Sequence, residues 1–462
     1  MTLKSSMVSY RFLKELEVAP SKPELKTLAQ ASEWIVAALK IALVGLHQRA
    51  DVLVGGSYAK GTLVTSTLYD IDVFIRCHGE MNELIQRLHS ILRELCMQHH
   101  LSFEHVHGSR EYFRIMYSIE NFTAYSQLPV KFSNGQLPRK EDISHAIVHK
   151  NIVFEIVPVA AIKKGSEYKN ITDLSYAHVG YVRKELRKHK NLMHEIGLAK
   201  LFCRAQRVYG AESYVQGFSG YALECLVISY GSFLGFLRAL VRAKEQVILD
   251  PAKKYKHKRE IMLSMNESKL KSPIVLVDPT WKERNVLAAL SEETFRRFQK
   301  AAQVFLKKPS MKFFMKQEIL EEDLLTRARK KKAELLTLHL ETTKQPGDIA
   351  GTKLKKFADV LARYFAPHFR VVEREFVYVG GHLARAYYFV TPTRGVLIRG
   401  PPLSMKEHAR RFKREHPHAI IKGGVMFATP LRIPSAREFL KMLLVRYEKM
   451  RCEMDVSMAR VV

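Results

Sequence analysis

The chain has few of the residues that hold together small secreted proteins or structural zinc sites. Its 462 residues include five cysteines, which are scattered and form no Cys-x-x-Cys pair. This set argues against a disulfide framework and against structural zinc, and it indicates reduced thiols in a cytosolic protein. The sequence shows no evident run of about 18 apolar residues, so we expect no membrane span. The first residues show no apolar core before a cleavage site, and we expect no secretory signal.

Acidic residues are scarce relative to basic ones. The chain has 46 Asp and Glu against 75 Lys and Arg, which gives a formal net charge of +29. Such a surplus attracts polyanions, and the phosphate backbone of nucleic acid is the usual one. A generally basic surface would give the same charge, so the number does not select a particular nucleic acid. The length predicts about two to four domains.

The most informative motif combines glycine, serine and two acids. An apolar lead-in at 52–54 precedes GGSYAKGT at 55–62, and Asp70-Ile71-Asp72 follows. Because successive side chains of a strand point to opposite faces, Asp70 and Asp72 project from one side while Ile71 enters the core. Two carboxylates on one face suit Mg²⁺, and a Gly-Ser turn can hold a triphosphate, so the local prediction is nucleotidyl transfer.

Each part of this motif is common by itself. Asp-x-Asp is usually a solvated strand edge, and Gly-Gly-Ser is usually a turn. Their combination resembles the catalytic signature of the DNA polymerase beta nucleotidyltransferase superfamily. A third acid, Glu155, interrupts an apolar strand predicted over 152–159. A charge there is costly unless it is paired or metal-bound, so we expect Glu155 beside the other two acids; an outward-facing glutamate is the alternative.

Further phrases extend the resemblance along the chain. They are DLSYAHV at 173–179, LAKLF at 198–202, VYGAE at 208–212, GFSGY at 217–221, VDP at 277–279 and RNV at 284–286. Together with the first motif, they resemble the archaeal-type, class I CCA-adding enzymes, which are tRNA nucleotidyltransferases. The resemblance runs in pieces from about residue 18 to residue 314 and continues more weakly to the C-terminus.

The resemblance implies roles for nine residues. The expected catalytic and metal-binding acids are Asp70, Asp72 and Glu155, and the expected nucleotide-binding residues are Ser57, Lys60, His178, Lys200, Tyr209 and Arg284. Arginine is common in the family where Lys60 stands, and lysine lacks its bidentate fork. Aspartate is expected where Glu155 stands, and the extra methylene shifts the carboxylate. Without the resemblance, a lone helical lysine is usually solvated and a tyrosine before glycine often packs.

The resemblance also implies an α+β multidomain fold. We expect a polymerase-beta-like nucleotidyltransferase head (mixed sheet with helices) at 1–180, a helical neck that completes the nucleotide pocket at 181–318, and an α/β body and tail that bind tRNA at 319–462. The implied activity is template-independent addition of CCA to the 3′ end of tRNA from CTP and ATP, with Mg²⁺ as cofactor and release of pyrophosphate. The implied partners are the tRNA acceptor stem and outer arm, ATP and CTP, in the cytoplasm and without a membrane. Homodimerisation is left open.

Two alternatives come from different classes. One is another template-independent RNA nucleotidyltransferase, such as a poly(A) polymerase or an oligoadenylate synthetase. The other is a basic RNA-binding protein whose transferase head has decayed. Such a protein would be expected to lack one of the carboxylates, and all three are present.

Local patterns give expectations for single segments. We expect helices over 18–48, 83–97 and 318–340, a surface excursion over 127–150, a buried helical segment over 219–240 and a strand over 369–379. The basic stretch 253–259 is either a phosphate-gripping loop or a solvated charge run. His99-His100 and His105-Val106-His107 offer no convincing third or fourth ligand, so we expect surface or sheet histidines instead of zinc ligands.

Overall fold

The computed structural model describes residues 10–45, 50–99, 101–107, 111–118, 151–161, 174–316, 318–365, 369–393, 398–428 and 435–462. The chain forms two compact units, Met1–Gln317 and Glu318–Val462. The segment 127–150, predicted as a surface excursion, lies outside the described residues.

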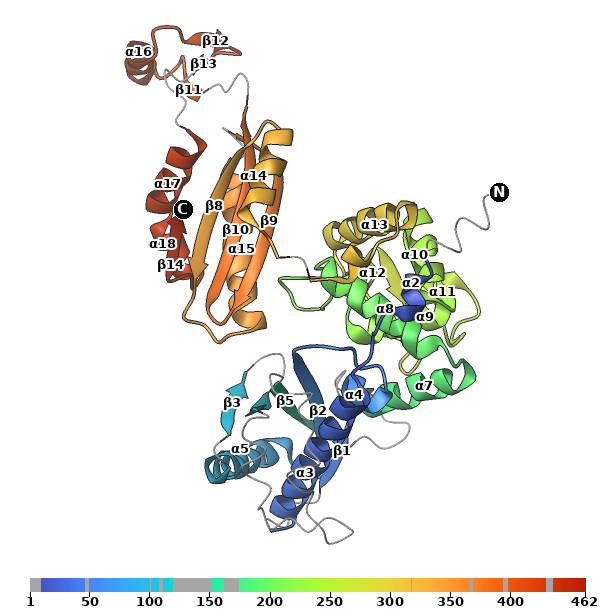
Figure 1. Ribbon diagram of the computed structural model, residues 1–462. Helices are drawn as coiled ribbons and strands as arrows, with labels where there is room; N and C mark the ends of the chain where they lie inside the picture. Colours follow the sequence, from blue (N-terminus) through green and yellow to red (C-terminus); the bar gives the residue numbers. More distant parts are fainter. Residues whose placement is uncertain are drawn as a thin grey trace, which may run out of the picture. The chain divides into compact units, whose positions relative to one another are not determined.

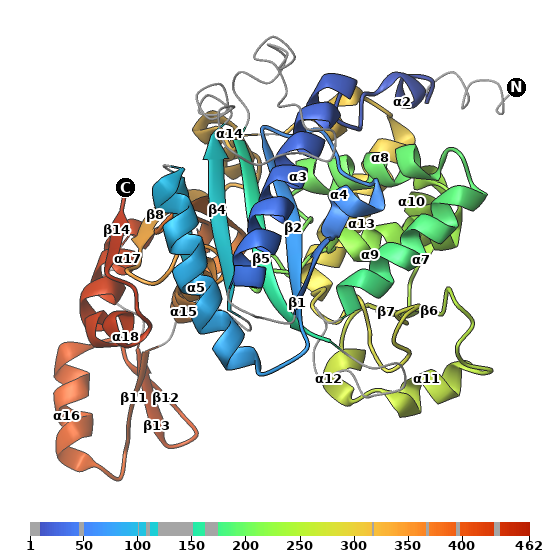
Figure 2. The ribbon, with the colours of Figure 1, turned by 90° about the horizontal axis from the view of Figure 1, so that it is seen from below.

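A five-stranded mixed sheet forms the first half of the first unit (Figures 1 and 2). Its strands are β1 (Ala50–Val54), β2 (Leu68–Cys77), β3 (Ser102–Val106), β4 (Tyr112–Ser118) and β5 (Asn151–Ala160), in the order β1-β2-β5-β4-β3. Strands β2 and β5 pair in parallel, and the other neighbours are antiparallel. The predicted mixed sheet with helices is therefore confirmed.

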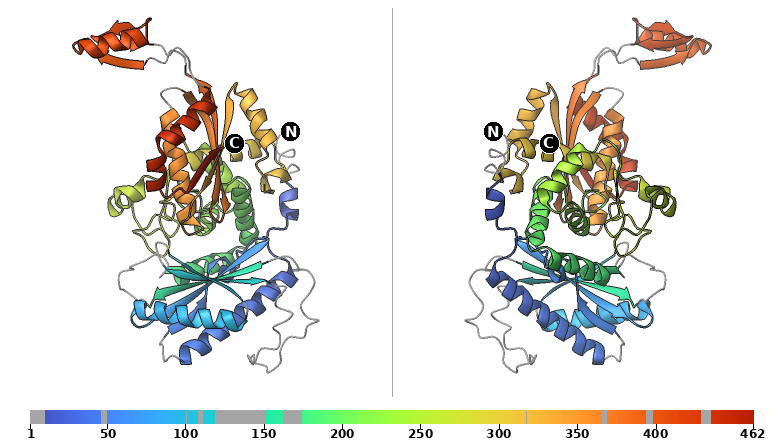
Figure 3. Two further views of the ribbon diagram at one scale, coloured as in Figure 1. Left: turned by 90° about the vertical axis from the view of Figure 1, so that its left-hand side faces the viewer. Right: turned by 90° about the vertical axis from the view of Figure 1, so that its right-hand side faces the viewer.

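Two helices, α3 (Lys22–Gly45) and α5 (Met81–Gln98), cover one face of this sheet (Figure 3). The helices predicted over 18–48 and 83–97 are thus present with shifted ends. By length and composition α3 could cross a membrane, contrary to the expectation of no membrane span. However, Leu28, Ile35 and Leu39 of α3 are buried in one core with Ile71 of β2 and Leu88 of α5. A core helix passes the same test of length and composition, and α3 is such a helix.

Helices dominate the rest of the first unit. They are α7 (Ser175–Lys188), α8 (Leu192–Ala205), α9 (Gly220–Tyr230), α10 (Phe233–Arg242), α11 (Lys258–Ser264), α12 (Glu267–Leu270) and α13 (Glu292–Lys307), with the short parallel pair β6 (Val247–Leu249) and β7 (Ile274–Leu276). Phenylalanines fill their core: Phe202, Phe218, Phe233, Phe236, Phe298 and Phe305 are fully buried. The buried segment predicted over 219–240 is confirmed as α9 and α10. The predicted division at residue 180 stays a prediction.

The second unit is built on an antiparallel sheet in the order β14-β8-β10-β9. Its strands are β8 (Glu334–Glu341), β9 (Phe369–Gly380), β10 (Leu383–Pro392) and β14 (Met458–Val461), with helices α14 (Glu321–Lys330), α15 (Asp348–Phe365), α17 (Ala436–Arg446) and α18 (Glu448–Glu453). A second sheet joins β11 (Ile398–Pro402), β13 (Val425–Ala428) and β12 (Ile420–Lys422), and α16 (Lys406–Glu415) contacts it. The strand predicted over 369–379 is confirmed.

The prediction of one long helix over 318–340 is wrong. The helix α14 ends at Lys330, and strand β8 begins at Glu334. Leucine favours helices by propensity, but Leu336, Leu338 and Leu340 are buried at every second position while the residues between them are more exposed. This period of two fits a strand whose one face packs on the core, and pairing with β10 decided the outcome.

Candidate active site

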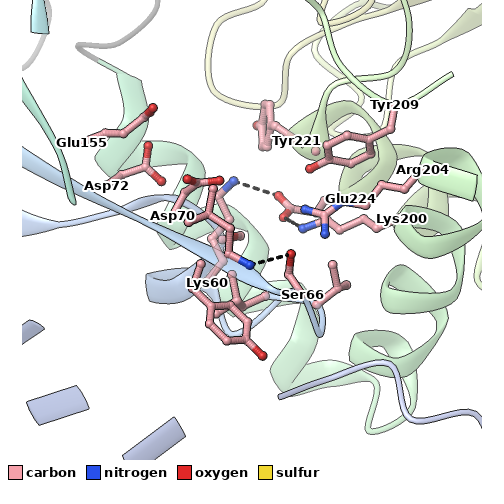
Figure 4. Close-up of a pocket in the computed structure, with 16 residues that line it drawn as sticks. Lys60, Ser66, Asp70, Asp72, Glu155, Lys200, Arg204, Tyr209, Tyr221 and Glu224 are labelled. Carbon is pink, nitrogen blue, oxygen red and sulfur yellow. Dashed lines mark hydrogen bonds and ion pairs between the residues drawn. The ribbon is translucent and has the colours of Figure 1, made fainter. Parts of the chain in front are cut away.

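Strands β2 and β5 bring the three predicted acids to one face of the sheet. Ile71 and Val73 of β2 are fully buried, so Asp70 and Asp72 project from the opposite face. In the parallel register of β2 and β5, Asp72 lies opposite Glu155. All three acids line one pocket, where Figure 4 shows their carboxylates close together. Glu155 therefore does not face away from the pair, and the alternative of an outward-facing glutamate is wrong.

The Gly-Ser loop packs directly against Asp72. The backbone N–H of Gly55 donates to the carbonyl oxygen of Asp72 at 2.9 Å. Gly56 has φ +59°, and a Cβ at this position would lie 1.6 Å from Asp72 Oδ2. Glycine is needed at residue 56 both for its conformation and for the space. The following short helix, α4 (Gly56–Lys60), places Ser57 and Lys60 along the pocket.

The acids repel one another in the absence of a cation. Desolvation in the pocket and the charge of Glu155 raise the pKa of Asp72 to about 7, and the same two causes raise the pKa of Asp70 to about 6. Arg114 of β4 offsets part of this charge, because its Nε and Nη2 both donate to Glu155 Oε1 at 3.0 Å. Three oxygen ligands with excess negative charge fit a hard divalent cation such as Mg²⁺.

A second charged cluster lies on the opposite side of the pocket and pairs one buried acid with two lysines. Glu224 of α9 is fully buried and accepts from Lys60 Nζ at 2.9 Å and from Lys200 Nζ at 2.7 Å. Thr62 Oγ1 also donates to Glu224, at 2.5 Å. Burial alone would raise the pKa of Glu224, but the charges of Lys200 and Lys60 lower it to about 2. This cluster joins α4, α8 and α9 through one carboxylate.

Aromatic and basic side chains complete the pocket. Tyr209 is half-buried, and the guanidinium of Arg204 lies 4.8 Å from the centre of its ring. Tyr221 lines the pocket from α9, and Lys60 Nζ lies 5.1 Å from the centre of the Tyr221 ring. The exposed Arg204 gives the pocket a cation that Glu224 does not bind in the described structure.

His178 and Arg284 form a neighbouring cluster around Asp278. His178 Nε2 lies 3.1 Å from Asp278 Oδ2, and Arg284 Nη1 donates to the same oxygen at 2.6 Å. Tyr221 donates to Asp278 Oδ1 at 3.2 Å, and its ring stacks on His178 at 3.9 Å. Burial lowers the pKa of His178 below its ordinary value, although Asp278 opposes this effect.

The structure thus brings together most of the predicted site residues. Asp70, Asp72, Glu155, Ser57, Lys60, Lys200 and Tyr209 line the pocket. Within the described part of the chain, the lining does not include His178 and Arg284, which adjoin it through Tyr221. Sequence reasoning missed Arg114, Arg204, Tyr221, Glu224 and Asp278. One signal was available: Glu224, like Glu155, is a lone acid in an apolar run.

Comparisons with known proteins find a matching family model and several similar enzymes. Residues 194–315 match a family model described as tRNA nucleotidyltransferase, second domain. The CCA-adding enzyme of Nanoarchaeum equitans is 30% identical over 60% of this chain and 59% of its own length. The CCA-adding enzyme of Methanosarcina barkeri is 27% identical over 92% of this chain and 86% of its own length, and that of Pyrococcus abyssi is 34% identical over 57% and 58%.

The chain thus spans less than two thirds of some of these relatives and most of others. A solved cytoplasmic RNA terminal U-transferase is 12% identical and covers 68% of this chain and 99% of its own, with a TM-score of 0.46. In sequence, the chain is thus similar to archaeal CCA-adding enzymes and, over residues 194–315, to the second domain of tRNA nucleotidyltransferases.

Proposed function

We propose that this protein adds CCA to the 3′ end of tRNA from CTP and ATP, without a nucleic-acid template and with release of pyrophosphate. The observation that carries the proposal is the convergence of Asp70, Asp72 and Glu155 on one pocket beside the Gly-Ser loop. This arrangement suits nucleotidyl transfer, in which positioning and charge provide most of the catalysis. Curated relatives with the name CCA-adding enzyme support the choice of product.

The three acids would hold Mg²⁺ through carboxylate oxygens. When bound, the ions lower the pKa of the RNA 3′-hydroxyl and stabilise the departing pyrophosphate. Asp72 is held in place by the Gly55–Asp72 backbone hydrogen bond, and Glu155 is oriented by Arg114. The residues therefore present a fixed acceptor surface for the ions.

Ser57, Lys60, Lys200 and Tyr209 would position the triphosphate. Lys60 and Lys200 share the carboxylate of Glu224, so Glu224 fixes both ammonium groups on the pocket wall. This carboxylate balances one of the two positive charges, and Arg204 adds a solvent-accessible cation for phosphate. Arg284 would help to form the adjoining base-recognising surface, and His178 would contact the triphosphate and sugar of the nucleotide. Asp278 holds both side chains.

The second unit would bind the acceptor stem and the outer arm of tRNA. Its helix α16 carries the basic sequence KEHARRFKRE, and most of these side chains are exposed. Contacts of this kind read the shape and the phosphates of RNA instead of its base sequence. The proposed location is the cytoplasm, where tRNA is processed.

The proposal is tested with tRNA that lacks its CCA end and with each labelled nucleotide supplied separately and together. A CCA-adding enzyme incorporates C, C and A and then stops. Continued addition of A would indicate a poly(A) polymerase, and oligoadenylate formed without tRNA would indicate a synthetase. The double variant Asp70→Ala, Asp72→Ala should lose incorporation while its affinity for tRNA stays nearly unchanged. No incorporation by the native chain, despite tRNA binding, would indicate a decayed enzyme.

A further inference from the structure

A group of metal-ligating side chains lies at the β3–β4 edge of the head, on the face of the sheet opposite to the pocket. Its members are His105 of β3, His107 just after it, and Glu111 just before β4, and their ligand atoms all lie within 4.8 Å of one another. The sequence offered two histidines and no evident third ligand. The antiparallel pairing of β3 with β4 brings Glu111 to the two histidines as the third ligand.

The antiparallel register explains why these three side chains meet. Strand β3 pairs with β4 so that His105 lies opposite Phe113 and Val106 lies opposite Tyr112. The next pair in the same register is His107 and Glu111. Residues two apart in a strand share a face, so His105, His107 and Glu111 all project from one side.

The opposite side of these strands belongs to the candidate active site. Arg114, next to Phe113, points the other way and binds Glu155. The histidine face instead packs toward α5, whose His89 lies 5.5 Å from His105 between ring centres. The two groups of ligands are therefore separated by the sheet, and they differ in chemistry: the pocket offers only oxygen, whereas this edge offers two imidazoles and one carboxylate.

The distances from each histidine to the Glu111 carboxylate are close to those between ligands of a tetrahedral ion. His105 Nε2 lies 3.4 Å from Glu111 Oε2, and His107 Nδ1 lies 3.5 Å from Glu111 Oε1. Zinc bonds of about 2.0–2.1 Å in tetrahedral geometry place neighbouring ligand atoms about 3.3 Å apart. The ring centres of His105 and His107 are 4.1 Å apart, so both imidazoles face the same carboxylate.

The surroundings also suit an ion site. The His105 ring stacks on Phe113 at 4.5 Å, and its side chain is only 21% exposed, which fixes the least mobile ligand against apolar surface. The side chains of His107 and Glu111 are 62% and 42% exposed, so an ion can reach the site from solution. Apolar packing around ligands limits solvent access and strengthens their bonds to the metal.

We propose that His105, His107 and Glu111 bind one zinc-class transition-metal ion, separate from the Mg²⁺ expected at Asp70, Asp72 and Glu155. Imidazole favours Zn²⁺ over Mg²⁺, so the two sites select different ions. The ion links the ends of β3 and β4 and stabilises the pairing of the edge strand β3 with β4, which carries Arg114. It needs no cysteine, in agreement with the scattered cysteines of this chain.

The test is a titration of the full-length, metal-free protein with Zn²⁺ alone, in the presence of excess Mg²⁺ to occupy the oxygen-only site. We expect one Zn²⁺ per chain and a Zn²⁺-dependent rise in the melting temperature. The variants His107→Ala and Glu111→Gln, at exposed positions, should weaken this binding at least about tenfold and remove the rise. His78→Ala is the matched control, because His78 also pairs with one acid, Asp51, at 3.0 Å but belongs to no group of three metal-ligating side chains among the described residues.

Absence of Zn²⁺ binding by the native chain would overturn the proposal, and so would binding of unchanged affinity in either ligand variant. Replacing Zn²⁺ by Co²⁺ gives a second readout that does not depend on stability. A four-coordinate site with imidazole ligands produces an intense visible absorption, which should be lost in His107→Ala and kept in His78→Ala. An absorption that persists in His107→Ala contradicts the assignment. Neither readout depends on the proposed transferase activity.

Discussion

The pocket contains two clusters of buried charge that differ in how the charge is compensated. Asp70, Asp72 and Glu155 have an excess of negative charge, and the pKa values of Asp70 and Asp72 are raised. Glu224 is more deeply buried but has two lysines, and its pKa is lowered to about 2. The comparison separates two kinds of acid: the first group needs an external cation, whereas the second is satisfied by the fold and serves as a structural support.

The largest expected effect comes from removing the charge of the first cluster without changing its shape. The double variant Asp70→Asn, Asp72→Asn should lose about 10³-fold or more in nucleotide incorporation, because the ions lose their ligands. Its free energy of unfolding, measured by urea denaturation without Mg²⁺, should not fall, because like-charge repulsion is removed. A variant that is destabilised would show that these acids support the fold, and the contrast between the clusters would be broken.

The opposite pattern is expected for the second cluster. Glu224→Gln leaves two buried ammonium groups without their carboxylate, and it should lower the free energy of unfolding by about 3–5 kcal/mol. Glu292→Gln is the control, because it removes an exposed i,i+4 ion pair with Arg296 and should cost less than about 1 kcal/mol. Equal effects in urea denaturation would mean that the Glu224 cluster is not the support that its geometry indicates.

The contact between the Gly-Ser loop and Asp72 can be tested by adding one methyl group. Gly56→Ala places a Cβ against the Asp72 carboxylate at a positive φ, and we expect a loss of about 1–3 kcal/mol in stability together with reduced incorporation. Gly79→Ala adds the same atom where it meets nothing within 4 Å. Thermal melts should show a lower melting temperature for Gly56→Ala than for Gly79→Ala. Equal melting temperatures would contradict the close packing of Gly56 against Asp72.

The smallest effect concerns pH. Because the folded protein raises the pKa values of Asp70 and Asp72 to about 6 and about 7, it binds more protons than the unfolded chain between about pH 4 and pH 7. These groups therefore lower stability as pH rises through this window, by the order of 1 kcal/mol after screening by water. The slope should diminish with Mg²⁺ or in Asp70→Asn, Asp72→Asn.

Glu224 contributes in the opposite direction. Its lowered pKa gives stability that is present above about pH 4.5 and is lost only as pH falls toward about 2. Urea denaturation of the metal-free protein at several pH values, compared between the native chain and the Asn double variant, separates the two contributions. If the free energy of unfolding depends on pH equally in the native chain and in the double variant, the raised pKa values of Asp70 and Asp72 do not distinguish the two clusters.

The sequence predicted the part of the site that depends on strand periodicity. The alternation of Asp70, Ile71 and Asp72 fixes which side chains share a face. Glu155, the single acid in an apolar strand, indicated which strand lies beside them. Resemblance to a family placed Lys200 and Tyr209 at the pocket. What failed was the β8 segment, where leucine propensity suggested a helix and the alternation of buried positions went unrecognised.

Contacts between distant segments were beyond the sequence pattern. No local pattern indicates that Glu224 would bind Lys60 and Lys200, which lie 164 and 24 residues away in the chain. Nor does one indicate that Asp278 would bind Arg284 and His178, the latter 100 residues away. The hairpin that brings Glu111 to His105 and His107 was also missed, although it is local. Its signal is the antiparallel register, which composition does not reveal.

The parallel pairing of β2 with β5 also has a consequence for synthesis on the ribosome. Asp72 is made well before Glu155, and the Lys60 partner on α9 follows later still. An emerging chain therefore has no assembled pocket until residue 224 has left the exit tunnel and docked. The buried acid that holds both lysines is thus the last residue of the described pocket lining to be made.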